Sequence, residues 1–130
     1  MSKDILPNGN ESIFIIDDEK ALLLLLKKLF TRLGYEVFVA ADGETAETTF
    51  REHWNTIQLI VLDQYLNNYD GMQLLKKFKK IKPEIKVILT SGFTIDEEYK
   101  KLESSIIEYY LQKPYNVEQL AKTVRKVLDT

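Results

Sequence analysis

Cysteine is absent from this 130-residue sequence, and histidine occurs only once, as His53. The absence of cysteine excludes a disulfide framework, a thiolate metal site and a cysteine nucleophile. His53 stands at the end of a predicted helix, where we expect a surface residue rather than a metal ligand or a base. Zinc, which favours cysteine and histidine ligands, is therefore not expected in this protein.

Long apolar segments and a strong charge imbalance are missing as well. No segment approaches the ~18 consecutive apolar residues of a membrane-spanning helix, and no signal peptide precedes the first predicted strand. The formal net charge of -2 argues against a general nucleic-acid-binding surface. With 45% hydrophobic and 29% charged residues, the chain has the composition of a globular domain. We expect a soluble, cytoplasmic protein with no membrane insertion and no direct nucleic-acid binding.

Short apolar runs alternate with amphipathic segments along the chain. The apolar runs predict strands at 12–16, 36–40, 58–63, 85–90 and 106–111. Helical periodicity predicts helices at about 20–33, 44–53, 71–82, 94–103 and 117–128. This alternation implies right-handed βαβ units, and thus an α/β fold with a doubly wound, five-stranded parallel sheet covered by five helices. Residues 1–11 lack periodicity, so we expect a tail or linker remnant before a single domain over residues 12–130.

The helical periodicity also predicts which side chains face the core. The buried face of the first helix is expected to carry Leu22, Leu25, Leu26, Leu29 and Leu33. Leu24 falls on the opposite face of this helix. The inward residues expected in and after the second helix are Ala46, Phe50 and Trp54.

Polar side chains follow the predicted strands at their carboxyl ends. In chain order they are Asp17 and Asp18, then Asp63, then Ser91 (or Thr90), then Lys113. In a doubly wound sheet, ligands bind in the crevice above this edge. Clustered carboxylates repel each other unless a cation is present, and oxygen donors suit Mg²⁺ or Mn²⁺. A lysine and a hydroxyl at the same edge supply the charge and the hydrogen-bond donor that a phosphoryl oxygen needs.

Each of these residues has a plainer structural interpretation when it is taken alone. Adjacent acids such as Asp17 and Asp18 often complement the start of a helix. A strand-end acid such as Asp63 is commonly a turn or capping residue. Their shared position at the ends of successive strands favours a metal pocket in which one Asp is free to act as a nucleophile.

Taken together, the motifs resemble those of response-regulator receiver domains of two-component signalling. The matching segments are the acidic pair within Ile15–Glu19, Asp63 followed by Asp70-Gly71, Ser91-Gly92, and Lys113-Pro114. The resemblance covers the chain from Ser12 to its carboxyl terminus. It implies a flavodoxin-like, three-layer fold with strand order 2-1-3-4-5.

The resemblance also implies roles for the residues at the strand ends. Asp63 would be phosphorylated by the phosphohistidine of a histidine kinase or of a histidine phosphotransfer domain. Mg²⁺ would be held by Asp18, Asp63 and the backbone carbonyl of Tyr65, with Asp17 acting through water. Lys113 would contact the phosphoryl group, and Ser91 would move toward it on activation. The protein would be a signalling receiver that catalyses only its own phosphorylation and dephosphorylation.

Three further expectations concern the response to phosphorylation and the partners. Tyr110 falls at the family's aromatic switch position, although an ordinary core residue would fit there equally well. The switching face would be formed by the fourth helix, the fifth strand and the fifth helix, and phosphorylation could lead to a homodimer on it. Leu24, as an exposed apolar residue of the first helix, is a candidate docking residue for the histidine-bearing partner, whereas the output partner is not indicated by the sequence.

Asn67 departs from the family pattern, because it stands where a proline is common in the loop after the phosphorylated Asp. We expect this departure to leave the loop more mobile.

Two other functional classes compete with this interpretation. A Mg²⁺-dependent phosphatase of the haloacid-dehalogenase type would carry Asp-x-Asp on its first strand and a cap domain, and neither is found here. A degenerate receiver that serves only as a docking module would lack phosphorylation residues, and all of them are present.

Overall fold

A five-stranded parallel sheet forms the centre of the protein, whose computed structural model describes residues 5–67, 69–92 and 106–130. Its strands are β1 (Ser12–Ile16), β2 (Glu36–Ala40), β3 (Leu59–Asp63), β6 (Lys86–Ser91) and β7 (Tyr109–Gln112). They lie in the order β2-β1-β3-β6-β7, and every neighbouring pair is parallel. The predicted strand order 2-1-3-4-5 is therefore confirmed.

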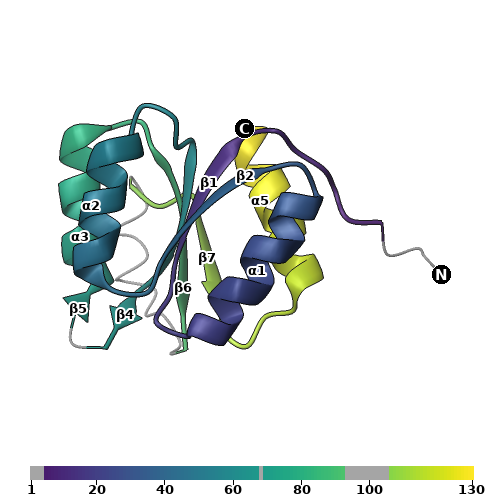
Figure 1. Ribbon diagram of the computed structural model, residues 1–130, viewed down its shortest axis with the longest axis horizontal. Helices are drawn as coiled ribbons and strands as arrows, with labels where there is room; N and C mark the ends of the chain where they lie inside the picture. The colour runs from purple at the N-terminus through teal and green to yellow at the C-terminus, as the bar shows by residue number, and fades with distance from the viewer. Residues whose placement is uncertain (1–4, 68, 93–105) are drawn as a thin grey trace.

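Helices cover both faces of the sheet, which gives the molecule three layers (Figure 1). On one face lie α2 (Gly43–His53) and α3 (Gly71–Ile81), and on the other lie α1 (Lys20–Arg32) and α5 (Val117–Leu128). The fifth helix that we predicted at 94–103 falls outside the described residues. Among the helices that the structure describes, none is long and apolar enough to cross a membrane.

Both faces of the central strands are buried, and this explains their continuous apolar runs. In β3, Ile60 and Leu62 belong to the core beneath α2 and α3, whereas Leu59 and Val61 belong to the core beneath α1 and α5. Fully burying one such side chain contributes about 1.5–3 kcal/mol to folding. The strand that ends in Asp63 is thus held from both sides, and this fixes where its last residue lies.

Side-chain caps set the starts of three helices. Asp42 accepts a hydrogen bond from the backbone amide of Thr45 at the start of α2. Asp70 caps α3 through the amide of Met72, and Asn116 caps α5 through the amide of Gln119. Asp70 and Asn116 are extended residues, and each satisfies an otherwise unpaired amide.

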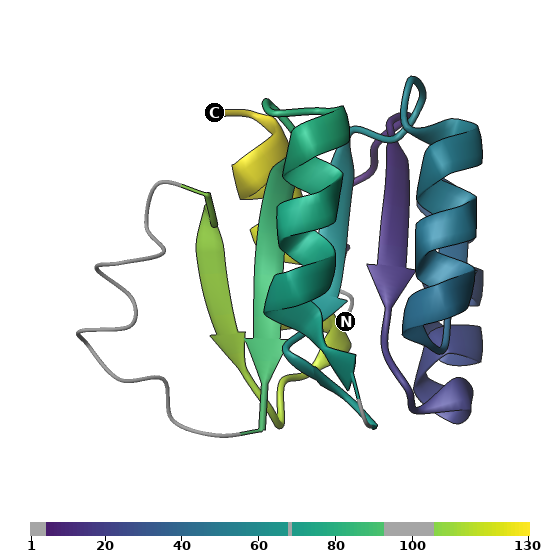
Figure 2. The ribbon, with the colours of Figure 1, turned by 90° about the vertical axis from the view of Figure 1, so that its left-hand side faces the viewer.

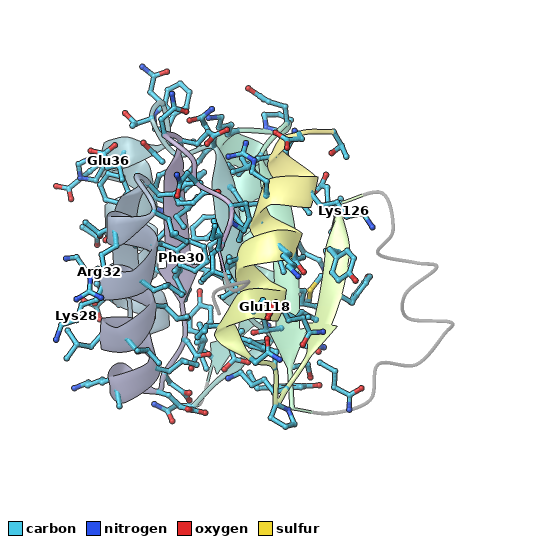
Figure 3. All side chains as sticks on the ribbon, turned by 90° about the vertical axis from the view of Figure 1, so that its right-hand side faces the viewer. Lys28, Phe30, Arg32, Glu36, Glu118 and Lys126 are labelled. Atoms are coloured by element: carbon cyan, nitrogen blue, oxygen red, sulfur yellow. The ribbon has the colours of Figure 1, made fainter. Side chains whose placement is uncertain are left out.

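Two predicted core positions are wrong. Leu25 is 53% exposed, because the buried stripe of α1 runs through Leu23, Leu26 and Phe30, about one residue around the helix from the predicted stripe. Figure 3 shows Phe30 between α1 and α5. Trp54 is 41% exposed, because α2 ends at His53 and the chain turns before Trp54 can reach the core.

Other positions match the predictions more closely. Leu24 is exposed, as predicted, and Ala46 and Phe50 are fully buried. His53 is an exposed residue at the end of α2, where its ring packs against that of Phe38. The last strand begins at Tyr109 rather than at Ile106, which lies in a turn.

The segment that we predicted as a tail or linker remnant contacts the domain through Leu6 and residues 8–11. The amide of Gly9 donates to the carbonyl of Leu33, which joins the segment to the end of α1. Arg125 of α5 forms two hydrogen bonds with the Glu11 carboxylate, at 3.1 and 2.6 Å, and a third with the Asn8 carbonyl at 3.0 Å. The Arg125–Glu11 pair therefore joins this segment to the last helix.

We predict that Glu11→Gln lowers the free energy of unfolding at pH 7 by about 1.5–3 kcal/mol, the usual range for a hydrogen bond to a charged group. Mainly because Arg125 hydrogen bonds to it, the pKa of Glu11 is lowered from 4.5 to about 2. A lowered carboxyl pKa means that the stabilisation is complete above the ordinary value and is lost as the pH falls toward 2. Urea denaturation of both proteins at a series of pH values measures this difference.

Asp129→Asn is the matched control, because Asp129 binds the same Arg125 from a more exposed position. Asp129→Asn should lower the free energy of unfolding by less than Glu11→Gln does, because exposed ion pairs usually contribute little to stability. Equal losses for the two variants, or a Glu11→Gln difference that does not shrink below pH 4, would contradict the role assigned to Glu11.

Candidate functional site

The polar residues predicted at the strand ends meet at one edge of the sheet. In Figure 2 the arrowheads of β1, β6 and β7 point to the same edge, where the short strands β4 and β5 also lie. Asp17 follows β1, Asp63 ends β3, Ser91 ends β6 and Lys113 follows β7. The structure therefore brings together Asp17, Asp63 and Lys113, with Asp18 beside them, as the direct contacts below show.

Lys113 joins the two most buried carboxylates of this edge. Its Nζ donates to Asp17 Oδ2 at 2.7 Å and to Asp63 Oδ2 at 3.3 Å. Asp17 and Asp63 are buried, and the Lys113 side chain is largely buried as well. Glu19 adds a third, more distant acid, with its Oε1 at 3.8 Å from Lys113 Nζ. This ammonium group therefore neutralises part of the negative charge in the pocket.

Three carboxylates can converge on one cation here. Asp17, Asp18 and Asp63 each offer an oxygen atom, and these oxygens lie within 4.8 Å of one another. Among the described residues this is the group of acids suited to holding a metal ion. Hard carboxylate oxygens without a thiolate or an imidazole fit Mg²⁺ or Mn²⁺, so the donor set agrees with the predicted cofactor.

Burial and neighbouring charges shift the pKa values of the pocket. Burial, and then the negative charge of Asp17, raise the pKa of Asp63, while Lys113 opposes this rise. Burial alone would lower the pKa of Lys113, but its hydrogen bond to Asp17 and the charges of both acids outweigh this effect and raise it. Lys113 therefore stays protonated, and the Asp63 carboxylate is less stable than it would be in water.

The segment after Asp63 forms a small hairpin. Its strands are β4 (Tyr65–Leu66) and β5 (Tyr69–Asp70), which pair antiparallel. Asn67, at its tip, has φ 49° and donates its backbone amide to Asp18 Oδ2 at 3.0 Å. A proline at this position could provide neither the positive φ nor the amide. The structure shows the Asn67 amide bonded to a pocket acid, and the greater mobility that we expected of this loop stays a prediction.

Gly71, just after the hairpin, lies against the backbone that carries Asp63. A Cβ atom at this position would lie 2.5 Å from the Asp63 carbonyl oxygen. The amide of Gly71 also donates to the carbonyl of Gln64 at 2.7 Å. The hairpin can therefore fold back beside Asp63 only because residue 71 lacks a side chain.

The remaining predicted residues lie on β4, β6 and β7. Tyr65 is half exposed and donates its amide to Asp63 Oδ1 at 3.3 Å. Ser91 is fully buried, and its carbonyl accepts a hydrogen bond from the amide of Lys113 at 2.7 Å. Thr90, the alternative hydroxyl, is also buried and pairs with Asp63 in the sheet register. Tyr110 is partly buried against the core beneath α2 and α3.

A cavity of about 390 Å³ opens beside Lys113, between the start of α1 and the segment after β7. Its lining residues are Glu19, Leu22, Gly92, Lys113, Pro114 and Tyr115. Leu24 does not line this cavity; it lies in a separate shallow groove with Lys27, Lys28, Thr31 and Arg32. Figure 3 shows Lys28 and Arg32 on the outer side of α1.

Two features of the site were not found from the sequence. The first is the Asn67 amide, a backbone group that gives no sequence signal beyond the tolerance of Asn for positive φ. The second is Tyr115, whose pKa is raised to about 12 by burial and then by the charge of Asp17. The sequence signal for Tyr115 was its position directly after Lys113-Pro114.

Comparisons with known proteins agree with this geometry. Residues 13–125 match the family model described as response regulator receiver domain. The chain is 29% identical to sporulation initiation phosphotransferase F of Bacillus subtilis over 92% of this chain and 94% of that protein. It is 30% identical to the sensor kinase CckA of Brucella abortus over 94% of this chain and 13% of that protein. The chain spans about half the length of several transcriptional regulators that it also matches.

Solved structures show the same likeness. A response regulator receiver domain protein from Clostridium thermocellum has a TM-score of 0.81 and 27% identity, covering 92% of this chain and 94% of that one. A CheY-like receiver domain protein from Methanospirillum hungatei has a TM-score of 0.78 and 28% identity, covering 93% and 95%.

We predict that Asp63→Asn raises the free energy of unfolding in EDTA at pH 7 by about 1 kcal/mol, an ordinary size for a single substitution. A carboxyl pKa that is raised on folding means that the ionised group destabilises the native state. The gain should shrink as the pH falls toward 3.8 and Asp63 is protonated in both states. Urea denaturation across pH tests this, with Glu52→Gln, an exposed acid of α2, as the neutral control. If Asp63→Asn is instead less stable than the wild type, the contact between Lys113 and Asp63 stabilises the fold by more than burial of the Asp63 carboxylate destabilises it.

Proposed function

Because the chain belongs to the response regulator receiver domain family, we propose that Asp63 accepts a phosphoryl group from a phosphohistidine. The donor is a histidine kinase or a histidine phosphotransfer domain, as is usual for two-component signalling. The observation that carries this proposal is the contact of Lys113 with both Asp17 and Asp63 beside a third carboxylate. An α/β crevice at this edge of the sheet is where such chemistry is expected.

In the proposed reaction, a carboxylate oxygen of Asp63 attacks the phosphorus atom of the phosphohistidine. An oxygen–phosphorus bond forms, the nitrogen–phosphorus bond breaks, and the electron pair leaves with the partner's imidazole, which then takes up a proton. Bound Mg²⁺ supplies positive charge for the phosphoryl oxygens. Asp18, Asp63 and the Tyr65 carbonyl would hold the ion directly, and Asp17 would hold it through water.

Lys113 and Ser91 have complementary tasks in this proposal. Lys113 already lies 3.3 Å from Asp63 Oδ2, so its ammonium group is close enough to contact an oxygen of the phosphoryl group formed there. Ser91 provides a hydroxyl that moves toward the phosphoryl group. The protein catalyses only these steps and the loss of its own phosphoryl group, so it acts as a cytoplasmic signalling receiver rather than as an enzyme on other substrates.

The conformational change on phosphorylation would pass from β6 to β7. The hydrogen bond between the Lys113 amide and the Ser91 carbonyl joins the two strand ends, so movement of Ser91 would displace the end of β7 as well. Tyr110 on β7 is the proposed aromatic partner of this movement. The proposed responding face includes β7 and α5, and the helix predicted at 94–103 falls outside the described residues. An output partner or a second copy of the chain would bind there.

We predict that incubation with acetyl phosphate and Mg²⁺ adds one phosphoryl group to the wild type and none to Asp63→Asn. Asp17 and Asp63 are both buried acids beside Lys113, and the resemblance to receiver domains assigns the phosphoryl group to the strand-end Asp63. Intact mass spectrometry measures the added group.

The matched control is Asp70→Asn, in an exposed acid at the other end of the β4–β5 hairpin that caps α3 instead of facing Lys113. It should be labelled like the wild type. Full labelling of Asp63→Asn would place the phosphorylation site elsewhere and overturn the proposal.

We further propose that Leu24 docks the histidine-bearing partner, because it is a 58% exposed apolar residue among cationic side chains on α1. Leu24→Lys is expected to slow phosphotransfer from the protein donor while leaving labelling by acetyl phosphate unchanged. Rapid-quench phosphotransfer from a phosphorylated partner domain measures the rate.

Leu25→Lys provides the comparison, because Leu25 is 53% exposed on the same helix but about 100° further around it. If only Leu25→Lys slows transfer, the docking surface lies on the other side of α1 and the assignment of Leu24 is wrong. If neither variant slows transfer, α1 does not dock the partner through either leucine.

A further inference from the structure

We propose that Tyr69 is a positioning residue for the cation pocket, acting through the β4–β5 hairpin. Hydrogen bonds of Tyr69 join the hairpin to α2 and α3. The Asn67 amide at the tip of the hairpin then orients Asp18. This inference rests on the proposed function, because it assumes that the pocket binds a divalent cation.

Tyr69 meets two helices at one point. Its hydroxyl donates to Glu47 Oε1 of α2 at 3.0 Å. Lys77 of α3 donates to the same Glu47 oxygen at 2.6 Å and to the Tyr69 hydroxyl at 3.0 Å. The side chain of Glu47 is 21% exposed and that of Lys77 is 50% exposed, so only the Glu47 end of this contact is shielded from water. The hairpin, α2 and α3 are therefore joined by one closed set of hydrogen bonds.

Gly43 makes room for the Tyr69 ring. A Cβ atom at residue 43 would lie 2.7 Å from Tyr69 Cδ2 and 2.8 Å from Cγ, near the root of the ring. Because these atoms lie close to the backbone, Tyr69 could not avoid the clash by a small adjustment at its tip. The ring also packs against the core beneath α2 and α3. Both ends of the Tyr69 side chain are thus fixed against α2.

The hairpin needs this support from outside itself. It pairs only Tyr65 with Asp70 and Leu66 with Tyr69, and a two-stranded hairpin of this size has little stability alone. Its tip also holds Asn67 at φ 49°, a conformation that Asn tolerates but does not favour. The Tyr69 contacts with α2 and α3 therefore determine where the tip lies.

The tip contacts the cation pocket directly. Tyr69 pairs with Leu66, the residue before Asn67, and the Asn67 amide donates to Asp18 Oδ2 at 3.0 Å. Within the described part of the chain, this amide is the one hydrogen-bond donor to the half-buried Asp18 carboxylate. Release of Tyr69 would let the tip shift and would leave Asp18 free to turn away from Asp17 and Asp63.

The test is the affinity for Mn²⁺ of the full chain, measured by electron paramagnetic resonance of the free ion. Tyr69→Phe keeps the ring and removes the hydroxyl, and it is expected to raise the Kd by up to about fivefold, the equivalent of one hydrogen bond of about 1 kcal/mol. Lys77→Met, which removes the second partner of the hydroxyl, should act in the same direction. A rise of about twofold or more in both variants supports the proposal, and a smaller change overturns it.

Arg51→Ala is the matched control. Arg51 binds the other carboxylate oxygen of Glu47 at 3.4 Å from a 67% exposed position on α2. Its removal should leave the Mn²⁺ affinity unchanged. If Arg51→Ala weakens binding as much as Tyr69→Phe does, the effect comes from α2 in general, and the role of Tyr69 is overturned.

A second readout separates positioning from a purely structural role. In nitrogen-15 NMR spectra of the metal-free protein, the Asn67 amide should move on Tyr69→Phe substitution and stay in place on Arg51→Ala substitution. An unmoved Asn67 amide in Tyr69→Phe would overturn the proposal.

The outcomes distinguish this inference from the function on which it rests. A wild-type protein that binds no Mn²⁺ would overturn the proposed function, and the positioning role with it. A wild type that binds Mn²⁺ with the same affinity as Tyr69→Phe would overturn the positioning role alone.

Discussion

The central constraint of this structure is the placement of two buried carboxylates against each other at the end of a dry sheet. Asp17 and Asp63 would repel each other strongly in such surroundings, and Lys113 makes their proximity tolerable by contacting both. The parallel topology brings the carboxyl ends of the strands to one edge, so polar residues that follow neighbouring strands lie close together. The residues that serve the proposed chemistry therefore also have to balance each other's charge before any ligand arrives.

Much of the fold and the site could be predicted because their signals are local. Short apolar runs, such as the four residues before Asp17 and the four before Asp63, predict both the strands and the edge at which Asp17, Asp63 and Lys113 gather. A parallel sheet then leaves little freedom in where those residues lie. Helix caps such as Asp70 and Asn116 also have local signals, because a capping side chain acts within three residues of its own position.

The features that the sequence did not reveal depend on contacts between distant segments. Leu22 to Leu26 are five consecutive leucines, so periodicity alone could not decide whether Leu23 or Leu25 faces the sheet. The Asn67–Asp18 contact joins residues 49 positions apart and uses a backbone amide. The Glu11–Arg125 pair spans 114 positions. In each case the three-dimensional arrangement of the elements decides which residue is buried or which residues are in contact. The local sequence does not distinguish the alternatives.

The close approach of Gly43 and Tyr69 restricts how this chain can change over time. Any side chain at residue 43 would collide with the ring of Tyr69, whereas a small residue at position 69 would remove that obstacle. Loss of the ring would therefore have to come first or together with a change at Gly43, and the reverse order would pass through an intermediate with a displaced hairpin. Two positions separated by the whole of β3 can thus be expected to change as a pair.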